Sequence, residues 1–529
     1  MRLTRRILST ALAAAAALAL LPGAPEAEPR RGGELVMIWA QTPRHLNPAV
    51  QSGAATGVPG TQIFASLLRY DDEWNPQPYL AESWEWADDG LSLTVRLVPN
   101  AVFHDGVPIT SSDVAFSIRT IQANHPFRSM FAPVEEIETP DAHTAIFRLS
   151  QPHPALLLAL SSALSPIIPE HVYGDGQDVA THPANSAPVG SGPFRLVEFR
   201  PGEQITLERF DDFFIEGRPY LDRIIIRVVP DPSTIVFSME ADEADILPFF
   251  DQAQGVRRLE RNDRLALTTR GYEGIGALNW LAFNTRRAPL DDVRVRQAIA
   301  YAVDRDFIIR ALQSGTSAVQ RGPIIESSPF FNPDLNPYDL DLDRANALLD
   351  EAGHPRDADG TRFDLTIDYI PGIPEQQQNV AEYIRSQLRQ VGIDVTVRAA
   401  PDFPTWAGRI AGGDFDMTMD LVFNWGDPVI GVHRTYLSSN IRPVIWSNTQ
   451  GYANERVDAL LAEAGQEQDP QRRAELYGEF QDVVVNDIPI YFLNIRSYHT
   501  FFDTRLGNPP VSIWGVMQAM DEVYWTEDR

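Results

Sequence analysis

The chain has 529 residues, 44% of them hydrophobic, a length that predicts several domains or lobes rather than one core. It contains no cysteine, which excludes disulfides, thiolate metal ligands and cysteine nucleophiles. All 44 basic residues are arginine, which excludes Schiff-base chemistry and a P-loop lysine, and the formal charge of -28 disfavours nucleic acid and anionic lipid as partners. Salt adaptation and a GC-rich genome would both account for this composition.

The amino terminus has the pattern of a secretory signal peptide, residues 1–27, with a basic start, an apolar run and small residues near Ala24 and Ala27. The run from Ile7 to Leu21 is too short and too alanine-rich for a membrane span, which needs about 20 strongly apolar residues. We expect export by the ordinary secretory route. A twin-arginine signal is the alternative. Without a lipid-anchoring cysteine, the mature chain is expected to be free in a Gram-negative periplasm.

The first half of the chain alternates short strands with turns. Residues 33–40 are predicted to form a buried strand that ends in a proline-bounded loop. Hydrophobicity alternates on both sides of Asp88, Asp89 and Gly90, and an Asp-Gly pair supplies the positive backbone angles of a tight turn. This pattern predicts a β-hairpin.

Helix and strand units follow in the second half. A helix is predicted within residues 291–312, where Asp291 or Asp292 is available as its N-cap. Residues 363–400 then contain a strand, a helix and a second strand, with Gly392 well placed to end the helix. This order indicates a right-handed parallel crossover and an α/β fold.

A further strand leads into the stretch FNWGDPVIGVHR, residues 423–434. Alternate residues from Phe415 to Trp425 are apolar and are expected to share one face of that strand. In open α/β sheets, ligands bind beyond the carboxyl ends of the strands, so this stretch is a candidate binding site.

No catalytic constellation is found in the sequence. The motifs GxSxG, HExxH, GxxxxGK[ST] and GxGxxG are absent, and no two of the ten histidines have the spacing of a metal-ligand pair. Acidic pairs such as Asp71 with Asp72 fit solvated turns better than a glycosidase dyad. We therefore expect no catalytic residues, no metal and no cofactor, and a binding protein rather than an enzyme.

Several segments resemble one known family, in that family's order and across nearly the whole mature chain. They are YLAESWEWADDGLSLTVRL (79–97), FHDGVPITSSDVAFSI (103–118), VGSGPFRLVEF (189–199), NWLAFNTRRAPLDDVRVRQAIAYAVDRDFII (279–309), RANALLDEAG (344–353), GYANERVDALL (451–461) and IPIYF (488–492). The family is that of the solute-binding proteins of bacterial ABC importers, specifically the dipeptide and oligopeptide class known as family 5.

The resemblance implies the two-lobed periplasmic-binding-protein fold, type II and large class, with an extra domain inserted in the first lobe. The first lobe would comprise residues 28–68, 189–273 and 489–529, the inserted domain residues 69–188, and the second lobe residues 274–488. Crossings near GYEGIGALNW and NDIPIYF would form the hinge, where a few residues absorb a closing motion.

Asp427 has two interpretations. In peptide binders of the family, an aspartate shortly after this tryptophan takes the α-ammonium of the ligand. Many relatives carry two acids in this loop, whereas this sequence keeps only Asp427-Pro428, which is also a good N-cap with proline at the first helical position. The cap is slightly favoured, and Asp427 could serve both roles.

Four further residues complete the predicted binding set. Arg434, seven residues after Asp427, would lie two turns along the same helix face and suit a carboxylate or phosphate, with pairing to the acidic surface as the alternative. Trp425 and Phe403 occupy positions that the family uses for the pocket wall, although either could be core. His45 would face the cleft by analogy, although a turn role is favoured. The family's carboxylate-binding arginine is missing from the loop PGIPEQQQ, which argues against strict dipeptide specificity.

The sequence thus predicts a periplasmic solute-binding component that captures a peptide or peptide-like solute and delivers it to an ABC permease in the inner membrane. A non-peptide solute, such as an opine-like conjugate, an oligosaccharide, haem or a metal chelate, is the alternative within the class. A secreted hydrolase is the alternative from another class. The protein is expected to be a monomer, not embedded in the membrane, with a small-molecule or short-peptide ligand and no nucleic acid partner.

Overall fold

Strand β1 (Glu34–Trp39), the first strand that the sequence predicts, is the middle strand of a seven-stranded sheet in the computed structural model, which describes residues 29–371 and 374–527. Its neighbours β10 and β11 are parallel to it, and the outer pairs are antiparallel. The predicted signal peptide lies outside the described residues. The sheet order is β12-β19-β11-β1-β10-β9-β8, formed by β8 (Phe194–Arg200), β9 (Gln204–Arg209), β10 (Arg223–Val228), β11 (Ile246–Phe250), β12 (Leu265–Thr268) and β19 (His499–Asp503).

Helices cover this sheet. The sheet and these helices together form the part of the molecule that we call the first lobe. Apolar side chains of α6 (Pro232–Glu240) and α7 (Ala253–Leu259) pack against β1, β11 and β19. The lobe also contains α2 (Ala54–Ile63), η6 (Gly515–Met517) and the short pair β20 (Leu506–Gly507) with β21 (Tyr524–Trp525).

The inserted domain is built on an antiparallel sheet in the order β4-β5-β7-β6, against which helix α3 (Ser111–Asn124) packs. The predicted hairpin is confirmed: β4 (Ala81–Trp86) and β5 (Ser92–Leu97) are joined at Gly90, whose positive φ of 66° the tight turn requires. The remaining elements are β2 (Leu68–Tyr70), β3 (Pro76–Pro78), η1 (Arg128–Phe131), β6 (Val134–Asp141), β7 (Thr144–Leu149), α4 (Leu156–Ala159), α5 (Glu170–Tyr173), η2 (Val179–Thr181) and η3 (Pro183–Asn185).

The second lobe has a six-stranded sheet in the order β14-β18-β13-β17-β15-β16. The predicted crossover is confirmed, because β15 (Phe363–Tyr369) and β16 (Ile393–Arg398) are parallel and joined by α11 (Pro374–Gln390), after which Gly392 has a positive φ of 86°. Asp292 caps α8 (Val293–Ala302) by accepting the Arg294 backbone N–H. Helices α8, α10 and α11 cover one face of the sheet, and α15 and α16 cover the other.

The other elements of the second lobe connect these layers. They are β13 (Ala277–Phe283), α9 (Arg305–Phe307), the π-helical turn η4 (Ile308–Leu312), β14 (Ala318–Val319), α10 (Leu342–Glu351), α12 (Phe403–Ala411), β17 (Met417–Phe423), α13 (Pro428–Gly431), α14 (His433–Tyr436), η5 (Ser438–Asn440), α15 (Glu455–Ala464), α16 (Pro470–Asp487) and β18 (Ile490–Ile495). In the described ranges, no helix combines the length and the apolarity that crossing a membrane requires.

One predicted boundary is wrong. We expected the chain to return to the first lobe at Pro489, but β18 pairs with β13 and β14 and therefore belongs to the second sheet. The return comes between Ile495 and the start of β19 at His499. There Arg496 forms an ion pair with Asp251 of the first lobe, while its backbone N–H donates to Ala277 at the start of β13. This crossing, rather than NDIPIYF, joins the lobes in addition to the one between β12 and β13, near GYEGIGALNW.

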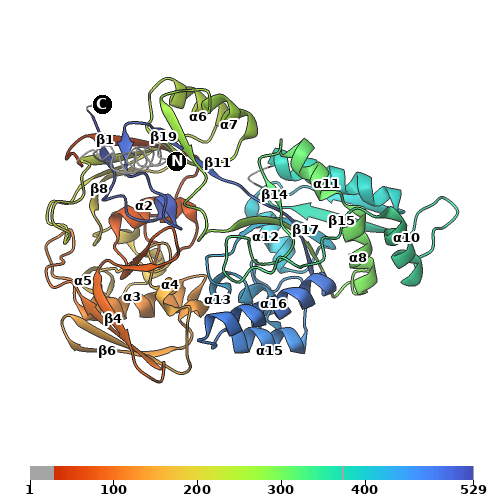
Figure 1. Cartoon of the computed structure of the whole chain (residues 1–529), viewed down its shortest axis with the longest axis horizontal. Coiled ribbons are helices and arrows are strands. Elements are labelled where there is room, and N and C mark those ends of the chain that lie inside the picture. Colours follow the sequence, from red (N-terminus) through yellow and green to blue (C-terminus); the bar gives the residue numbers. More distant parts are fainter. Residues whose placement is uncertain (1–28, 372–373, 528–529) are drawn as a thin grey trace, which may run out of the picture.

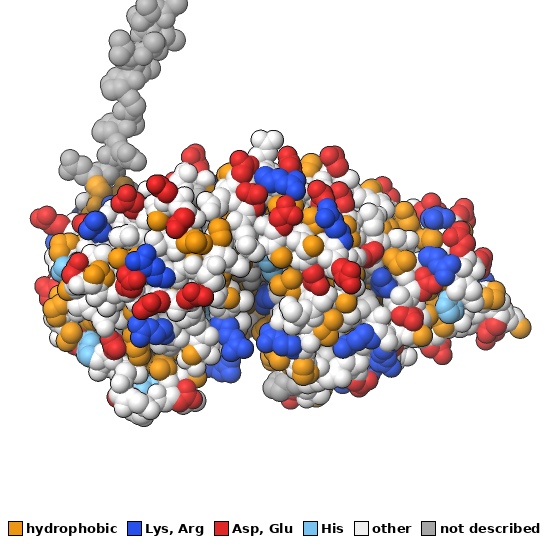
Figure 2. Space-filling view, turned by 90° about the horizontal axis from the view of Figure 1, so that it is seen from below, with side chains coloured by type: hydrophobic (Ala, Val, Ile, Leu, Met, Phe, Trp, Pro, Cys, Tyr) orange, Lys and Arg blue, Asp and Glu red, His pale blue; other side chains and the backbone are white. Residues whose placement is uncertain are grey.

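The first lobe and the inserted domain form one half of the molecule, and the second lobe forms the other (Figure 1). The halves meet where α13 lies beside the inserted domain's α4 and η1. Figure 2 shows a groove between the halves, with arginine side chains on both sides of it. The chain links and this contact therefore leave an open-sided groove between the two halves.

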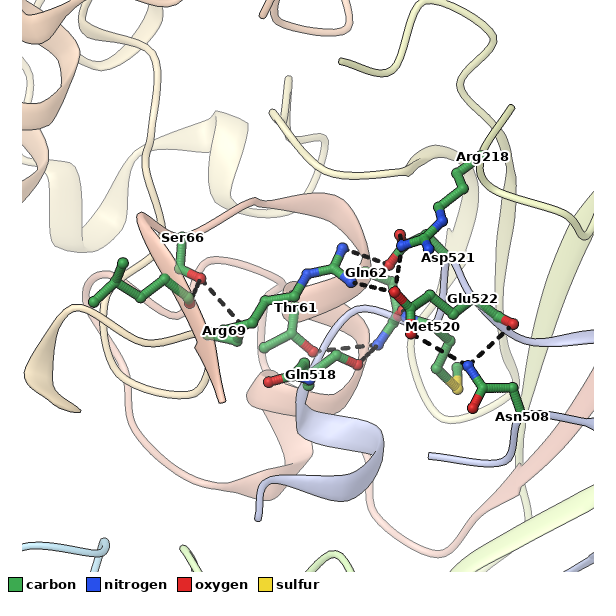
Figure 3. A network of polar contacts seen from close by, with 12 residues as sticks. Thr61, Gln62, Ser66, Arg69, Arg218, Asn508, Gln518, Met520, Asp521 and Glu522 are labelled. Atoms are coloured by element: carbon green, nitrogen blue, oxygen red, sulfur yellow. Dashed lines mark hydrogen bonds and ion pairs between the residues drawn. The ribbon is translucent and has the colours of Figure 1, made fainter. Parts of the chain in front are cut away.

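The carboxyl-terminal segment is tied to the first lobe and the inserted domain by the polar network in Figure 3. The buried Arg69 of β2 donates to Asp521 at 2.6 Å, and Arg218 pairs with both Asp521 and Glu522. Gln62 of α2 accepts the Met520 backbone N–H at 2.8 Å. A cavity of about 430 Å³ lies beside this network. Because both arginines that line it are already paired with carboxylates, the cavity offers no free cation to a ligand.

Candidate functional site

The stretch after β17 is placed by close backbone packing. Trp425 and Gly426 both have positive φ, 52° and 77°, so the strand ends in a sharp turn. Gly431 lies so close to the Asn424 backbone that a β-carbon would be 1.7 Å from its carbonyl oxygen. This turn directs the loop out of the second lobe, beyond the carboxyl end of β17, as the sequence predicts.

Trp425 lies between the two halves. Its ring is 5.3 Å from that of Phe127 in the inserted domain, 6.4 Å from Trp514 in the first lobe and 5.5 Å from Phe423 at the end of β17. Trp425 and Ile430 belong to the apolar cluster of the first lobe and the inserted domain rather than to either main cluster of the second lobe. The indole is only 3% exposed, so the surrounding protein covers it.

Asp427 is the predicted helix cap and also part of a buried ion pair. Its side chain accepts the Val429 backbone N–H at 2.9 Å, with Pro428 as the first residue of α13. Both carboxylate oxygens also accept from Arg473 of α16, at 2.7 and 2.8 Å. Burial alone would raise the pKa of Asp427, but the Arg473 charge and these hydrogen bonds lower it. Each oxygen of this carboxylate is therefore occupied by the protein itself.

Arg434 faces the inserted domain. Its guanidinium carbon lies 4.8 Å from the centre of the Phe127 ring, and its Nε donates to the Gly431 carbonyl at 3.2 Å. No ion pair joins it to a carboxylate within the described ranges. Burial lowers the pKa of Arg434 to about 10, and the charge of Asp420 offsets part of this shift. Our placement of Arg434 two turns along one helix from Asp427 is wrong, because α13 ends at Gly431 and α14 begins at His433.

Asp420 is an acid inside β17 that the sequence analysis did not select. Its Oδ1 accepts the Leu421 backbone N–H at 2.7 Å, and its Oδ2 accepts the indole N–H of Trp446 at 2.9 Å. Burial raises its pKa to about 7, against the lowering effects of these two donors and of Arg434. The signal available in the sequence was an acid at the centre of the mostly apolar run MTMDLVF.

Phe403 and His45 occupy different surroundings. Phe403, 39% exposed, packs against Trp406 at 5.7 Å and Trp446 at 5.8 Å, so it belongs to an aromatic group joined to Asp420 through the Trp446 indole. His45 is half-buried in the first lobe, where its Nδ1 accepts the Asn47 backbone N–H at 3.3 Å. Burial and the neighbouring Arg44 lower the pKa of His45. The structure thus gives His45 the turn role that the sequence favours, and its contact with a ligand stays a prediction.

Arginines neutralise the acidic cluster that comes nearest to a metal-site arrangement. Asp242, Asp245 and Asp503 bring carboxylate oxygens close together in the first lobe. Arg264 pairs with Asp242 at 3.0 Å and with Asp503 at 2.8 Å, and Arg505 pairs with Asp503 at 2.9 Å. These guanidinium groups supply the positive charge that a metal ion would otherwise bring.

The contact at Gly426 yields a first testable prediction. A β-carbon there would lie 2.7 Å from Leu158 of the inserted domain and 3.2 Å from Trp74, in addition to the strain of the positive φ. Gly426→Ala is expected to lower the midpoint of thermal unfolding more than the backbone strain alone does, because the Leu158 and Trp74 side chains must shift to make room. Gly353→Ala is the control, because its φ of 86° carries the same strain, about 1 to 2 kcal/mol, but nothing lies within 4 Å. Equal behaviour of the two variants would contradict this account of the contact.

Comparisons with known proteins agree with this architecture. The family model described as "Bacterial extracellular solute-binding proteins, family 5 Middle" matches residues 75–443, more than half of the chain. Heme-binding protein A of Haemophilus influenzae is 29% identical over 88% of this chain and 87% of its own length. The glutathione-binding protein GsiB of Pectobacterium atrosepticum is 28% identical over 87% and 88%, respectively.

Solved structures show the same fold. AgaA of A. tumefaciens R10, solved with agropinic acid, superposes with a TM-score of 0.80 at 26% identity, covering 94% of this chain and 99% of its own. AppA of Bacillus subtilis, solved with a nonapeptide, also has a TM-score of 0.80, at 22% identity, covering 94% and 100%. The predicted two-lobed α/β fold with an inserted domain is thus confirmed. The chain belongs to the bacterial extracellular solute-binding proteins of family 5.

Proposed function

We propose that the protein is the periplasmic solute-binding component of an ABC importer and captures a peptide or peptide-like solute between its two lobes. The observation that carries the proposal is the position of the Trp425 loop. This loop extends from the carboxyl end of β17 into the junction with the inserted domain and the first lobe, where Phe127, Trp514 and Arg434 surround it. A solute bound there would contact both halves and hold them together, which is how a binding protein couples its ligand to closure.

The ligand class is supported by the relatives and by the chemistry of the junction. Relatives named for glutathione, dipeptide and oligopeptide binding match 84–89% of this chain. The ligands in these names are all peptides. At the junction, flat aromatic faces such as those of Trp425 and Phe127 suit varied side chains with little loss of entropy. In this proposal the protein binds and releases its solute unchanged and delivers it to a permease of the inner membrane.

Thermal unfolding with a panel of solutes tests the proposal. Ligand binding to the folded state alone stabilises it by about 2.7 kcal/mol at 100 times the Kd, so the midpoint should rise with the logarithm of peptide concentration. Di- to pentapeptides are expected to raise it, whereas opine-like conjugates, oligosaccharides and haem are not. Stabilisation by the non-peptide set alone, or steady turnover of a peptide, would contradict the proposal.

A further inference from the structure

Arg434 is half-buried, and its guanidinium has different contacts from those of the buried arginines in the described part of the chain. Arg69 and Arg473 each pair with a buried or nearly buried aspartate, Asp521 and Asp427. Arg296 and Arg305 each donate to several backbone carbonyls. Arg434 uses only its Nε, which leaves its two terminal nitrogens without a hydrogen-bond partner among the described residues.

The terminal nitrogens of Arg434 are reachable from solvent in the free protein. Arg434 is only half-buried, and neither terminal nitrogen is a fully buried polar atom without a partner, so water can solvate them where a ligand anion is absent. Carboxylates are plentiful in a chain of formal charge -28, yet among the described residues none forms an ion pair with this arginine. The charge of Asp420 acts on Arg434 from a distance. The Asp420 carboxylate accepts hydrogen bonds from the Leu421 backbone N–H and the Trp446 indole, and not from Arg434.

The position of the free nitrogens indicates which group they would meet. Arg434 comes from the second lobe and lies over Phe127 of the inserted domain, whose ring is in contact with Trp425. An anion bound to Arg434 would thus lie between the two halves, next to aromatic rings from both. Two parallel N–H donors match the planar geometry of a carboxylate.

The ammonium end of a peptide finds no equivalent receptor in this loop. Asp427 has each oxygen committed to Arg473, one of them also to the Val429 N–H, and the residue is 6% exposed. Removing Arg473 from this pair would leave a buried carboxylate without compensation, so a ligand ammonium cannot replace it without a large rearrangement.

We propose that the solute is a carboxylate-bearing peptide or peptide-like acid and that Arg434 binds its carboxylate. A free α-ammonium is not required for binding. This inference rests on the proposed function. The carboxylate is the first group recognised, and the aromatic rings of Trp425 and Phe127 contact the adjoining part of the solute. Acids with a blocked or absent amine are ligands on the same terms as free peptides.

The test uses the full mature protein and a tripeptide library in three forms: free, N-acetylated and C-amidated. Retention is measured by equilibrium dialysis and mass spectrometry. The free and N-acetylated forms are expected to bind within about threefold of each other, and the amidated form about tenfold or more weakly, since charge-assisted hydrogen bonds are lost. In Arg434→Gln the three forms should bind equally weakly, while Arg148→Gln, which removes an exposed arginine paired with Glu138, should behave as the wild type.

Each outcome separates the inference from the proposed function. Equal binding of the amidated form, or loss of binding on acetylation, would overturn the inference while leaving peptide capture intact. Retention of none of the three libraries would contradict the proposed function.

A second measurement then tests Arg434 without any peptide, in protein freed of ligand by unfolding and refolding. Arg434→Met is expected to leave the unfolding midpoint unchanged or to raise it, whereas Arg473→Met should lower it by several degrees. An equal fall in both variants would mark Arg434 as a structural cation and overturn the inference.

Discussion

Replacing Arg473 with methionine is expected to lower the free energy of unfolding by about 3 to 5 kcal/mol, because it leaves the buried Asp427 carboxylate without its partner. The methionine retains some of the contact that the guanidinium makes with Phe330 and Tyr477, at 4.8 and 5.4 Å from their ring centres. Loss of a helix cap alone would amount to about 1 kcal/mol, so the size of the effect separates the ion pair from the cap.

Denaturant unfolding of a double-mutant cycle measures this pair. The double variant Asp427→Asn with Arg473→Met should recover most of the loss, since asparagine keeps the cap and no buried charge remains. Arg148→Met is the matched control, because its partner Glu138 is an exposed pair at 2.8 Å and should contribute less than about 1 kcal/mol. A loss at Arg473 no larger than that at Arg148 would contradict the importance of the ion pair.

The same pair has a defined pH window. Because Arg473 holds the pKa of Asp427 below its ordinary value, the stabilisation is complete above that ordinary value, about 4. It is lost as the pH falls through the lower pKa of the folded state. The difference between wild type and the double variant should therefore shrink in acid, and it should be constant near neutrality.

Local signals in the sequence predicted the local structure well. The Asp-Gly turn at Gly90, the cap at Asp292 and the helix end at Gly392 each depend on a few neighbouring residues, and each is confirmed. The crossover of β15, α11 and β16 follows from periodicity and spacing over less than 40 residues. The segments that resemble the family then placed these units in two lobes.

The candidate site depended on contacts that the sequence does not reveal. Arg473 lies 46 residues after Asp427, in a helix whose own pattern gives no reason to turn an arginine inward. The interruption between α13 and α14 accompanies the approach of Gly431 to the Asn424 backbone, which a helical wheel cannot show. Phe127 comes from another domain. Such long-range partners decide whether Asp427 and Arg434 are free for a ligand.

The boundary at Pro489 failed for a related reason. The resemblance indicated where the chain crosses between lobes, but β18 is apolar except for Asn494 and would suit either sheet. Its pairing with β13 and β14 places β18 in the second sheet. Pairing between strands over 170 residues apart is set by the tertiary fold rather than by local sequence.

Replacing Asp420 with asparagine is expected to make the protein markedly less sensitive to pH between 5 and 8. Burial raises the pKa of this carboxyl to about 7, above its ordinary value of about 4. The folded state therefore holds a proton that the unfolded state releases, and stability falls as the pH rises from about 4 to about 7. For a shift of this size the loss between pH 5 and pH 8 is about 2 to 3 kcal/mol.

Urea unfolding at pH 5, 6.5 and 8 tests this expectation through the change of stability with pH, so that a constant penalty from altered hydrogen bonding to Leu421 or Trp446 does not affect the result. The stability of Asp420→Asn relative to wild type should rise by about 2 to 3 kcal/mol from pH 5 to pH 8. Asp394→Asn, at an exposed position of β16, controls for the removal of one negative charge from an acidic protein. If both variants follow the wild-type pH profile, Asp420 is not the buried acid that its contacts indicate. The environment described for Arg434 would then be wrong as well, because the charges of Asp420 and Arg434 act on each other.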